Sequence, residues 1–307
     1  EVIVADNGSS DDSVDFLKKH YPDLRLIEFD RNYGFTGGYN KALRQVEAKY
    51  YVLLNSDVEV TPGWLEPLKR CLDENSNVAA CMPKMKAYHN KSYFEYAGAA
   101  GGFIDRLGYP FCRGRILDTV EEDVGQYEKS TEIFWATGAC MFVRAGLFHE
   151  LGGFDDAFFA HMEEIDLCWR LKNRGHSIRY VPDSTVYHVG GGTLPNDNPF
   201  KLYLNYRNNL FLLYKNLPRK KFRPVIFSRL FLDVLSSLTF LARGNPSSFI
   251  SVYKAHHHFL KALAGLRKKR QSNARYIADY PEGVYTKSIL ISYFLKKRKK
   301  FTQLPFP

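Results

Sequence analysis

The 307-residue sequence has few cysteines, and their distribution excludes two kinds of stabilising site. They are odd in number, dispersed and without a Cys-x-x-Cys pair: Cys71, Cys81, Cys112, Cys140 and Cys168. Such a distribution indicates neither a disulfide framework nor a zinc site. It is typical of a protein that works in a reducing cytoplasm.

The sequence also lacks an uninterrupted apolar run of the ~20 residues that a membrane-spanning helix needs. Its most apolar stretch, 225–241, is interrupted by Arg229 and Asp233. We therefore expect a helix that lies at a membrane interface and does not cross the membrane.

Acidic residues nearly disappear from the last third of the chain. Residues 1–200 carry 21 Lys and Arg against 30 Asp and Glu, whereas residues 201–307 carry 22 against 3. A strongly basic end favours an anionic surface, either lipid headgroups or nucleic acid. Because the basic clusters alternate with apolar helices and match no recognisable nucleic-acid fold, we expect an anionic membrane surface and no nucleic acid.

Alternation of strand and helix patterns marks the start of the chain. Residues 1–5 form a short β-branched run, turn formers and helix caps follow, and residues 24–29 are typical of the next strand. Together with the 45% hydrophobic content, this βαβ pattern predicts one large α/β domain with a mostly parallel sheet, plus an appendage. Ligands of such a sheet bind at the carboxyl ends of its strands.

Glycines concentrate where the second strand gives way to a helix, in the stretch 31–40. The spacing is not Gly-x-Gly-x-x-Gly, and no Walker lysine follows. Glycines at such a junction let the backbone approach a ligand and expose N–H groups to phosphate or ribose.

Asn55-Ser56-Asp57 follows the buried-type strand 50–55 directly. Oxygen ligands two residues apart suit a hard divalent cation that also bridges phosphates. An ordinary loop that caps the next helix, 62–72, is the alternative for Asp57.

Carboxylates, aromatics and an arginine crowd together in the stretch 158–170, which we predict to be a catalytic helix. Glu163, Glu164 and Asp166 lie within two turns of Arg170. A structural ion pair with Arg170 is the alternative for Glu163 or Asp166, because residues four apart share a helix face.

These segments, in this order, resemble glycosyltransferase family two of the GT-A fold, in particular its rhamnosyltransferase-like branch. The resemblance is carried by Asp6-Asn-Gly-Ser9, Asn32-Tyr-Gly-Phe-Thr-Gly-Gly-Tyr-Asn40, Leu54-Asn-Ser-Asp57 and Glu163-Glu164. It implies donor binding by the first two segments and metal binding by the third. It also places the family's first strand before Glu1, and the metal motif begins with Asn55 where the family has Asp.

The resemblance implies roles for individual residues. Glu164 is expected to be the general base, with Glu163 and Asp166 as alternatives because the family has Asp at position 164. Donor binding is expected of Asp6, Asn7, Ser9, Asn32, Gly37, Gly38, Asn40 and Ser56. Acceptor binding is expected of Trp135, Thr137 and Arg170, and metal binding of Asp57, Asn55 and His188; a core tryptophan and a structural histidine are the alternatives for Trp135 and His188.

Taken together, the sequence predicts an inverting, metal-dependent glycosyltransferase. It would move a sugar, with rhamnose suggested, from a nucleotide-diphosphate donor to a glycan or lipid-linked acceptor in cell-surface polysaccharide synthesis, using Mg²⁺ or Mn²⁺. Residues 1–199 are the expected catalytic domain, and residues 200–307 are an expected helical region that holds the protein peripherally at the inner face of the cell membrane. A catalytically inactive sugar-nucleotide-binding relative and a basic nucleic-acid-binding module are the alternatives.

Overall fold

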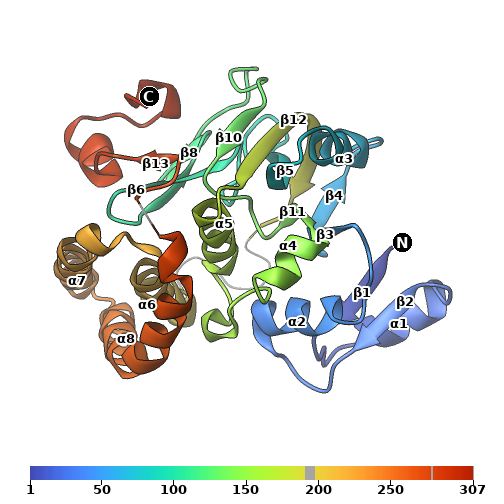
Figure 1. The fold of residues 1–307 in the computed structure, drawn as a ribbon, viewed down its shortest axis with the longest axis horizontal. Helices are drawn as coiled ribbons and strands as arrows, with labels where there is room; N and C mark the ends of the chain where they lie inside the picture. The colour runs from blue at the N-terminus through green and yellow to red at the C-terminus, as the bar shows by residue number, and fades with distance from the viewer. Residues whose placement is uncertain (191–197, 278, 307) are drawn as a thin grey trace.

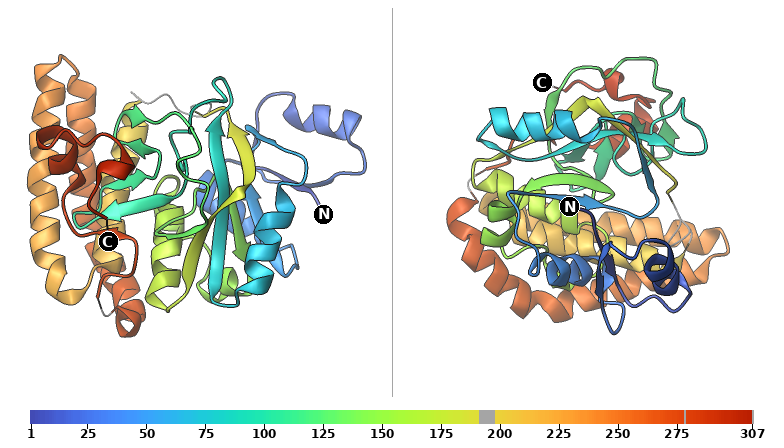
Figure 2. Two further views of the ribbon diagram at one scale, coloured as in Figure 1. Left: turned by 90° about the horizontal axis from the view of Figure 1, so that it is seen from above. Right: turned by 90° about the vertical axis from the view of Figure 1, so that its right-hand side faces the viewer.

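A computed structural model describes residues 1–190, 198–277 and 279–306 of the chain. A central β-sheet separates a small N-terminal unit from a group of long helices (Figures 1 and 2). The strands of the central sheet are β3 (Tyr50–Leu54), β4 (Val58–Val60), β5 (Val78–Ala87), β10 (Thr131–Ile133), β11 (Cys140–Arg144) and β12 (Ser177–His188).

The central sheet is mixed. Its strand order is β10-β12-β5-β11-β3, and β4 pairs with the far end of β12. Only β12 and β5 run parallel within the described sheet; the other pairs are antiparallel. The α/β class is thus confirmed, but the expectation of a mostly parallel sheet needs correction, because β11 returns between β5 and β3 in the opposite direction.

The predicted βαβ start is present as a separate unit. Strand β1 (Ile3–Asp6) pairs in parallel with β2 (Arg25–Glu28) across helix α1 (Ser13–His20), and these two strands form a sheet of their own. Helix α2 (Gly34–Leu43) follows and leads back to β3 in the central sheet. The turn after β1 and the start of α2 therefore lie at the same carboxyl edge (Figure 1).

Four short strands between β5 and β10, together with one strand from the end of the chain, form a second, five-stranded sheet. Its order is β13-β6-β7-β8-β9, with β6 (Gly102–Asp105), β7 (Pro110–Cys112), β8 (Arg115–Ile116), β9 (Thr119–Val120) and β13 (Val284–Tyr285). Strand β13 comes from the end of the chain and pairs in parallel with β6. The C-terminal residues are thereby built into the body of the protein.

Helices flank both sheets. They are α3 (Leu65–Glu74), α4 (Ala145–Glu150), α5 (Glu163–Asn173), α6 (Pro199–Asn216), α7 (Arg219–Ala242) and α8 (Pro246–Asn273). Helix α5 lies between the central sheet and α6, and α7 and α8 pack outside α6 (Figures 1 and 2). By length and composition alone, α7 is long and apolar enough to cross a membrane.

Residues from both predicted regions contribute to one hydrophobic cluster. Phe103 and Phe111 of the second sheet share it with Phe211 of α6 and Phe259 of α8. The boundary at residue 199 stays a prediction, although the contacts show that the last hundred residues are packed against the rest and not merely tethered to it.

Candidate active site

Helix α5 begins at Glu163, five residues later than predicted. A short 3-10 turn, Asp156–Phe158, precedes it. Phe159, His161 and Met162 then have positive φ angles of 65°, 68° and 73°. A left-handed backbone is unfavourable for residues other than glycine and is often found at functional sites. The apolar pattern at 158–162 thus belongs to a bent loop that presents the first turn of α5.

Glu163 and Glu164 occupy that first turn. Glu163 is buried and Glu164 is partly exposed. Among the described residues, Oε2 of neither side chain has a hydrogen-bond partner. Burial raises the pKa of Glu164 to about 7, and burial together with the Glu164 charge raises the pKa of Glu163 well above its usual range. A carboxyl group with a pKa near 7 is suited to accept a proton at neutral pH.

Asp166, in the same first turns of α5, is part of a closed ion network. It is fully buried, and its oxygens accept from Arg170 Nε (2.7 Å), Lys215 Nζ (2.8 Å) and Asn216 Nδ2 (2.8 Å). Although burial alone raises the pKa of Asp166, Lys215 and Arg170 lower it below its usual range. This geometry favours the structural ion pair over a catalytic role for Asp166.

Arg170 is a second member of the same network. Besides Asp166, its guanidinium donates to the carbonyls of Leu151 (2.9 Å) and Gly153 (2.8 Å). Arg170 is also buried. The guanidinium holds α5 against the loop at residues 151–153, and its expected acceptor role stays a prediction.

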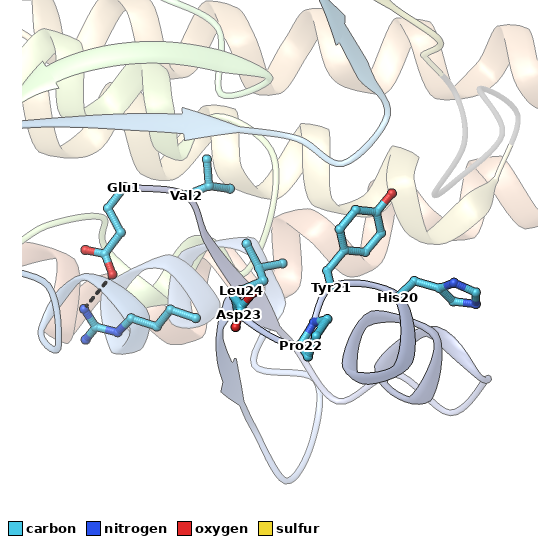
Figure 3. Close-up of a pocket in the computed structure, with 8 residues that line it drawn as sticks. Glu1, Val2, His20, Tyr21, Pro22, Asp23 and Leu24 are labelled. Atoms are coloured by element: carbon cyan, nitrogen blue, oxygen red, sulfur yellow. Dashed lines mark ion pairs between the residues drawn. The ribbon is translucent and has the colours of Figure 1, made fainter.

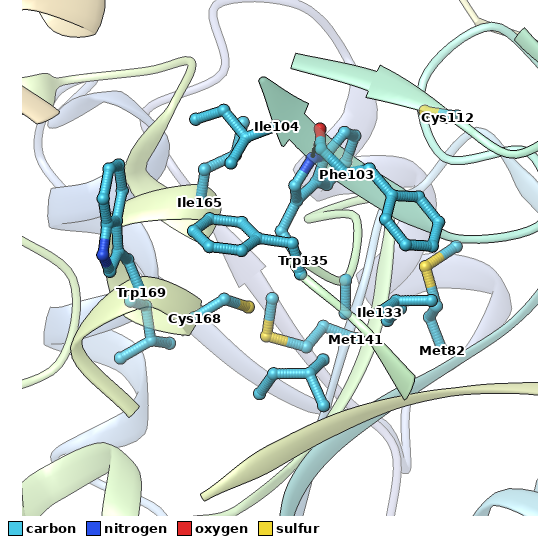
Figure 4. Packing of buried hydrophobic residues seen from close by; sticks show 14 of the residues in the cluster. Met82, Phe103, Ile104, Cys112, Ile133, Trp135, Met141, Ile165, Cys168 and Trp169 are labelled. Atoms are coloured by element: carbon cyan, nitrogen blue, oxygen red, sulfur yellow. Dashed lines mark hydrogen bonds between the residues drawn. The ribbon is translucent and has the colours of Figure 1, made fainter. Parts of the chain in front are cut away.

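Trp135 and Thr137 are buried as well. The Trp135 indole packs over Gly102 beside Phe103 and donates from Nε1 to the Phe103 carbonyl at 2.9 Å (Figure 4). Thr137 accepts from the backbone N–H of Ala139 at 3.2 Å. Trp135 is therefore packed in the core and Thr137 supports a turn, and acceptor binding by these two side chains stays a prediction.

The turn at residues 137–139 lies between Glu164, the predicted base, and the predicted metal ligands. A side chain at Gly138 would contact both Phe35 and Glu164. The next carbonyl, that of Ala139, accepts from the backbone N–H of Asn55 at 3.0 Å. The structure thus brings the end of β3 and the start of α5 to the same side of this turn.

Asp57 and His188 meet although they are 131 residues apart. Antiparallel pairing of β4 with β12 places His188 opposite Val58, and His188 Nε2 lies 3.2 Å from Asp57 Oδ1. Adjacent ligands of an octahedral Mg²⁺ ion, each about 2.1 Å from the metal, are about 3 Å apart. This spacing of the two side chains suits a divalent cation, and Asn55 lies in the same turn. The described residues hold no ready-made group of three or more His, Cys, Asp or Glu arranged for a metal.

Glu95, which sequence analysis did not identify, lies behind His188. Its Oε1 is 3.4 Å from His188 Nδ1, an ion-pair distance without hydrogen-bond geometry, and its Oε2 accepts from the backbone N–H of Ala97. Burial alone lowers the pKa of His188, but Glu95 and Asp57 together raise it. A carboxylate behind a metal-binding histidine commonly orients the ring.

The predicted donor segments form one loop cluster at the end of β1. Asn7 Nδ2 donates to Asn32 Oδ1 (3.2 Å) and to the Gly34 carbonyl (3.0 Å), and Asn7 Oδ1 accepts from the Tyr33 N–H (3.0 Å). Asp6 accepts from the N–H groups of Gly8 and Ser9 at 3.1 Å. The sequence-predicted segments 6–9 and 32–38 therefore do come together, with much of their polar capacity used to shape the loops.

Glycines in α2 are required by this packing. A Cβ at Gly38 would lie 3.1 Å from Asn7 Nδ2, and one at Gly37 would lie 2.9 Å from the Tyr33 side chain. Ser9 and Ser56 are exposed at the same edge. These four positions stay predicted donor contacts.

Asn40, by contrast, faces away from that edge. It is buried, donates to the Phe154 carbonyl (2.8 Å) and Asp156 Oδ1 (2.6 Å), and accepts from the Phe154 N–H (2.9 Å). The amide fastens α2 to the loop before α5, and its expected donor role stays a prediction.

An open hollow lies elsewhere, beside the start of β1 and β2, and includes Pro22 and Leu24 (Figure 3). Glu1 and Arg25 pair across it at 3.5 Å. Its lining includes none of the predicted site residues, so it adds nothing to the candidate site.

Partly exposed aromatic side chains run from the loop before Glu163 to α6 and α8, and sequence analysis did not assign them to a site. Phe159 packs on Gly34 at the start of α2, and its ring centroid is 6.2 Å from that of Phe200 in α6. Phe200 stacks on Tyr203 at 6.0 Å, and Tyr203 contacts His258 of α8 at 5.4 Å. The i, i+3 spacing of Phe200 and Tyr203 was the only sequence signal, and it does not distinguish an exposed track from a buried face.

Comparison with known proteins agrees with this geometry. The sequence profile described as glycosyl transferase family 2 matches residues 1–152. Rhamnosyltransferase WbbL of Escherichia coli (strain K12) is 32% identical over 230 residues, which cover 72% of this chain and 83% of that protein. The N-acetylglucosaminyl-diphospho-decaprenol L-rhamnosyltransferase of Mycobacterium tuberculosis (strain ATCC 25618 / H37Rv) is 25% identical over 227 residues, covering 69% and 74%.

A crystal structure of GalNAc-T7 with UDP, GalNAc and Mn²⁺ superposes with a TM-score of 0.55 at 16% identity, covering 70% of this chain and 42% of that chain. This likeness establishes the GT-A fold of the glycosyltransferases. The chain belongs to glycosyl transferase family 2.

Proposed function

We propose that the protein is an inverting glycosyltransferase in which Glu164 is the general base. The single observation that carries the residue assignment is the position of Glu164. It is partly exposed, its Oε2 has no partner among the described residues, and it lies beside Gly138, as Phe35 of α2 does, in the turn whose Ala139 carbonyl bonds Asn55. Glu163 is buried, and the carboxylate oxygens of Asp166 are paired with Arg170 and Lys215.

The chemistry is a direct displacement. As the acceptor hydroxyl forms a bond to the anomeric carbon of the sugar, its proton passes to Glu164, and the bond to the nucleotide diphosphate breaks on the opposite face. A base with a pKa near the working pH accepts such a proton efficiently. One displacement inverts the configuration at the anomeric carbon.

Asp57, His188 and Asn55 would hold a divalent cation, Mg²⁺ or Mn²⁺, at the end of β3. When bound, such a cation offsets charge on the departing diphosphate. The spacing of Asp57 and His188 supports this assignment. Asp57→Ala should abolish Mn²⁺ binding measured by isothermal titration, while its fold is retained because the side chain lies in a surface turn; undiminished binding would place the ion elsewhere.

The donor is proposed to be a nucleotide-diphosphate sugar, with rhamnose as the sugar. Two of the relatives are named as rhamnosyltransferases. The loop cluster at Asp6, Asn7 and Asn32 would receive the nucleoside and the start of α2 its phosphates. A glycan or a lipid-linked sugar in cell-surface polysaccharide synthesis would be the acceptor, and the aromatic track Phe159, Phe200 and Tyr203 would stack against its rings.

A membrane contact through α7 is proposed from its exposed face. Apolar side chains recur at helical spacing along this face and remain exposed: Phe227, Phe231, Val234, Leu235, Leu238 and Leu241. Basic residues border the stripe at both ends, with Arg219, Lys220 and Lys221 before it and Arg243 after it. An apolar stripe with basic borders suits an anionic bilayer surface. The protein would then be cytoplasmic and peripheral at the inner face of the cell membrane.

The function is tested by thermal-shift screening of the full chain against dTDP-, UDP- and GDP-sugars, with and without Mn²⁺. We expect one sugar nucleotide to stabilise the protein more strongly with the cation, and the same compound to support transfer to an acceptor. Binding without any turnover would instead identify an inactive sugar-nucleotide-binding relative.

A further inference from the structure

The loop that presents the base is bent against its own conformational preference. Three of the four residues before Glu163 are left-handed and none of them is glycine: Phe159, His161 and Met162. Such a backbone persists only where surrounding groups hold it. The groups that hold this loop lie in α6.

Asn208 of α6 is the group that holds the loop. It is fully buried, and its side-chain amide donates to the carbonyls of Phe158 (2.9 Å), Ala160 (2.8 Å) and His161 (2.8 Å). Its two N–H bonds thus serve three acceptors, so all of its donor capacity is directed at this loop.

Arg207 completes the contact from the neighbouring position. Its Nη2 donates to the carbonyls of Ala157 (3.0 Å) and Phe158 (2.9 Å), and its Nε donates to Asn208 Oδ1 (2.9 Å). The guanidinium therefore fixes the orientation of the Asn208 amide as well as the start of the loop.

The same loop also contacts the donor side. The Phe159 carbonyl accepts from the backbone N–H of Thr36 at 3.1 Å, and the Met162 carbonyl accepts from the N–H of Asp166 at 2.9 Å in the first turn of α5. The position of Glu164 relative to the start of α2 is thereby set through residues 158–162.

We propose that Asn208 is a positioning residue for the transfer reaction, which holds the strained loop so that Glu164 faces the acceptor hydroxyl in line with the donor. This inference rests on the proposed function of Glu164. Arg207 supports Asn208 in the same task. A misplacement of about 1 Å in such a constellation costs on the order of 10²-fold in rate.

The chain offers a matched control in the next residue. Asn209 is also buried in α6 and also donates to a backbone carbonyl, that of Gly108 at 2.6 Å, but this carbonyl belongs to the turn between β6 and β7. Asn208→Ala and Asn209→Ala each remove a buried amide from one helix and leave carbonyls without that donor. Only the first change reaches the loop before Glu164.

The experiment measures thermal stability, donor affinity and single-turnover transfer at saturating donor for both variants. We expect both to lose stability. Asn208→Ala should lower the single-turnover rate by at least tenfold with donor affinity within about twofold, whereas Asn209→Ala should keep the rate within about twofold. Equal rates in the two variants, or a wild-type rate in Asn208→Ala, would overturn the proposal.

Two further readouts keep the test decisive. Arg207→Lys retains the charge of a partly exposed residue but loses the forked contact. It should therefore show a smaller loss of rate even if Asn208→Ala fails to fold, and an unchanged rate in Arg207→Lys counts against the proposal.

In Asn208→Ala the pH midpoint of the rate should fall, because a released Glu164 becomes better solvated. An unmoved midpoint contradicts loop displacement. If Glu164→Gln itself keeps the wild-type rate, the proposed function fails, whereas loss in Glu164→Gln with retention in Asn208→Ala refutes the positioning role alone.

Discussion

At the scale of single residues, the environment of Glu164 makes activity and stability depend on pH in opposite ways. Its pKa is raised to about 7 by burial, from an unfolded value near 4.5. The single-turnover rate should rise with pH through about 7 and level off above it, because the base acts in its ionised form. A rate that is flat between pH 5.5 and 8.5 would contradict this assignment.

The folded state, in turn, disfavours the ionised carboxyl. The stability associated with neutral Glu164 is fully present below pH 4.5 and is lost as pH rises through 7. Glu164→Gln cannot ionise, so its melting temperature should exceed that of the wild type by a few degrees at pH 8 and match it near pH 4.5. Differential scanning calorimetry at the two pH values measures this; a lower melting temperature at pH 8 would contradict it.

Neutralising Asp166 should lower stability, whereas neutralising Glu164 should raise it. Asp166→Asn removes the charge that faces Lys215 and Arg170 in a fully buried network. Removing one partner of a buried ion pair costs about 3–5 kcal/mol, because it leaves an uncompensated charge. Urea unfolding should show a loss of this size, while donor affinity of the folded protein stays unchanged. A variant that is as stable as the wild type but inactive would return Asp166 to the list of candidate bases.

The sequence predicts which residues are candidates for the site better than it predicts what surrounds each of them. Asn55, Asp57 and His188 were identified by strand ends and by resemblance, and the structure brings Asp57 and His188 together. The burial of Trp135, Arg170 and Asn40 could not be predicted, because the same residue type occurs both in a core and at a ligand. Only the tertiary contacts, here backbone carbonyls at Phe103, Gly153 and Phe154, distinguish the two.

At the scale of elements, strands followed from local sequence more readily than the start of α5 did. The apolar run at 50–54 is extended as expected, with Tyr51 and Leu53 buried. The apolar spacing at 158–162 also looked helical, but contacts from Asn208 and Thr36 hold a left-handed backbone there. Those partners are about 50 and 120 residues away in sequence, so no local pattern contains this information.

Helix α7 supplies a prediction at this scale. Phe227 and Phe231 are 76% and 59% exposed on its apolar face. Replacing both with Gln leaves the charge unchanged but removes apolar side chains that would each contribute about 1.5–3 kcal/mol when buried in a bilayer. Partitioning onto anionic vesicles should fall at least tenfold in a sedimentation assay.

Phe16→Gln is the matched control for α7. Phe16 is 51% exposed on α1, at the opposite end of the molecule from α7 (Figure 2). Its replacement should leave vesicle binding unchanged. If it weakens binding as much as the α7 double variant does, or if the double variant binds normally, the α7 surface is not the membrane contact.

At the scale of the whole molecule, the basic C-terminal region is part of the structure that holds the site. Lys215 pairs with Asp155 and Asp166, Lys269 of α8 also pairs with Asp155, and β13 adds a strand to the second sheet. The sequence predicts this region only as an appendage to the α/β domain. The contacts across the chain argue against that expectation.

Deletion of residues 219–307 should therefore destabilise the remaining protein. It removes Phe259 and Leu266 of α8 from the common hydrophobic cluster and exposes their partners. Large cavities of this kind cost several kcal/mol for each side chain lost. We expect an aggregated or strongly destabilised product in a solubility and thermal-unfolding assay. A soluble truncation with wild-type melting behaviour would show that the two regions are energetically independent.

The central claim, that Glu164 is the base, is tested most directly by single-turnover transfer measured together with donor affinity in Glu164→Gln, Glu163→Gln and Asp166→Asn. The account predicts that Glu164→Gln alone loses roughly 10²–10⁴-fold in the chemical step while its donor affinity stays near that of the wild type. Retention of the chemical step in Glu164→Gln, with its loss in either of the other variants, would contradict the account.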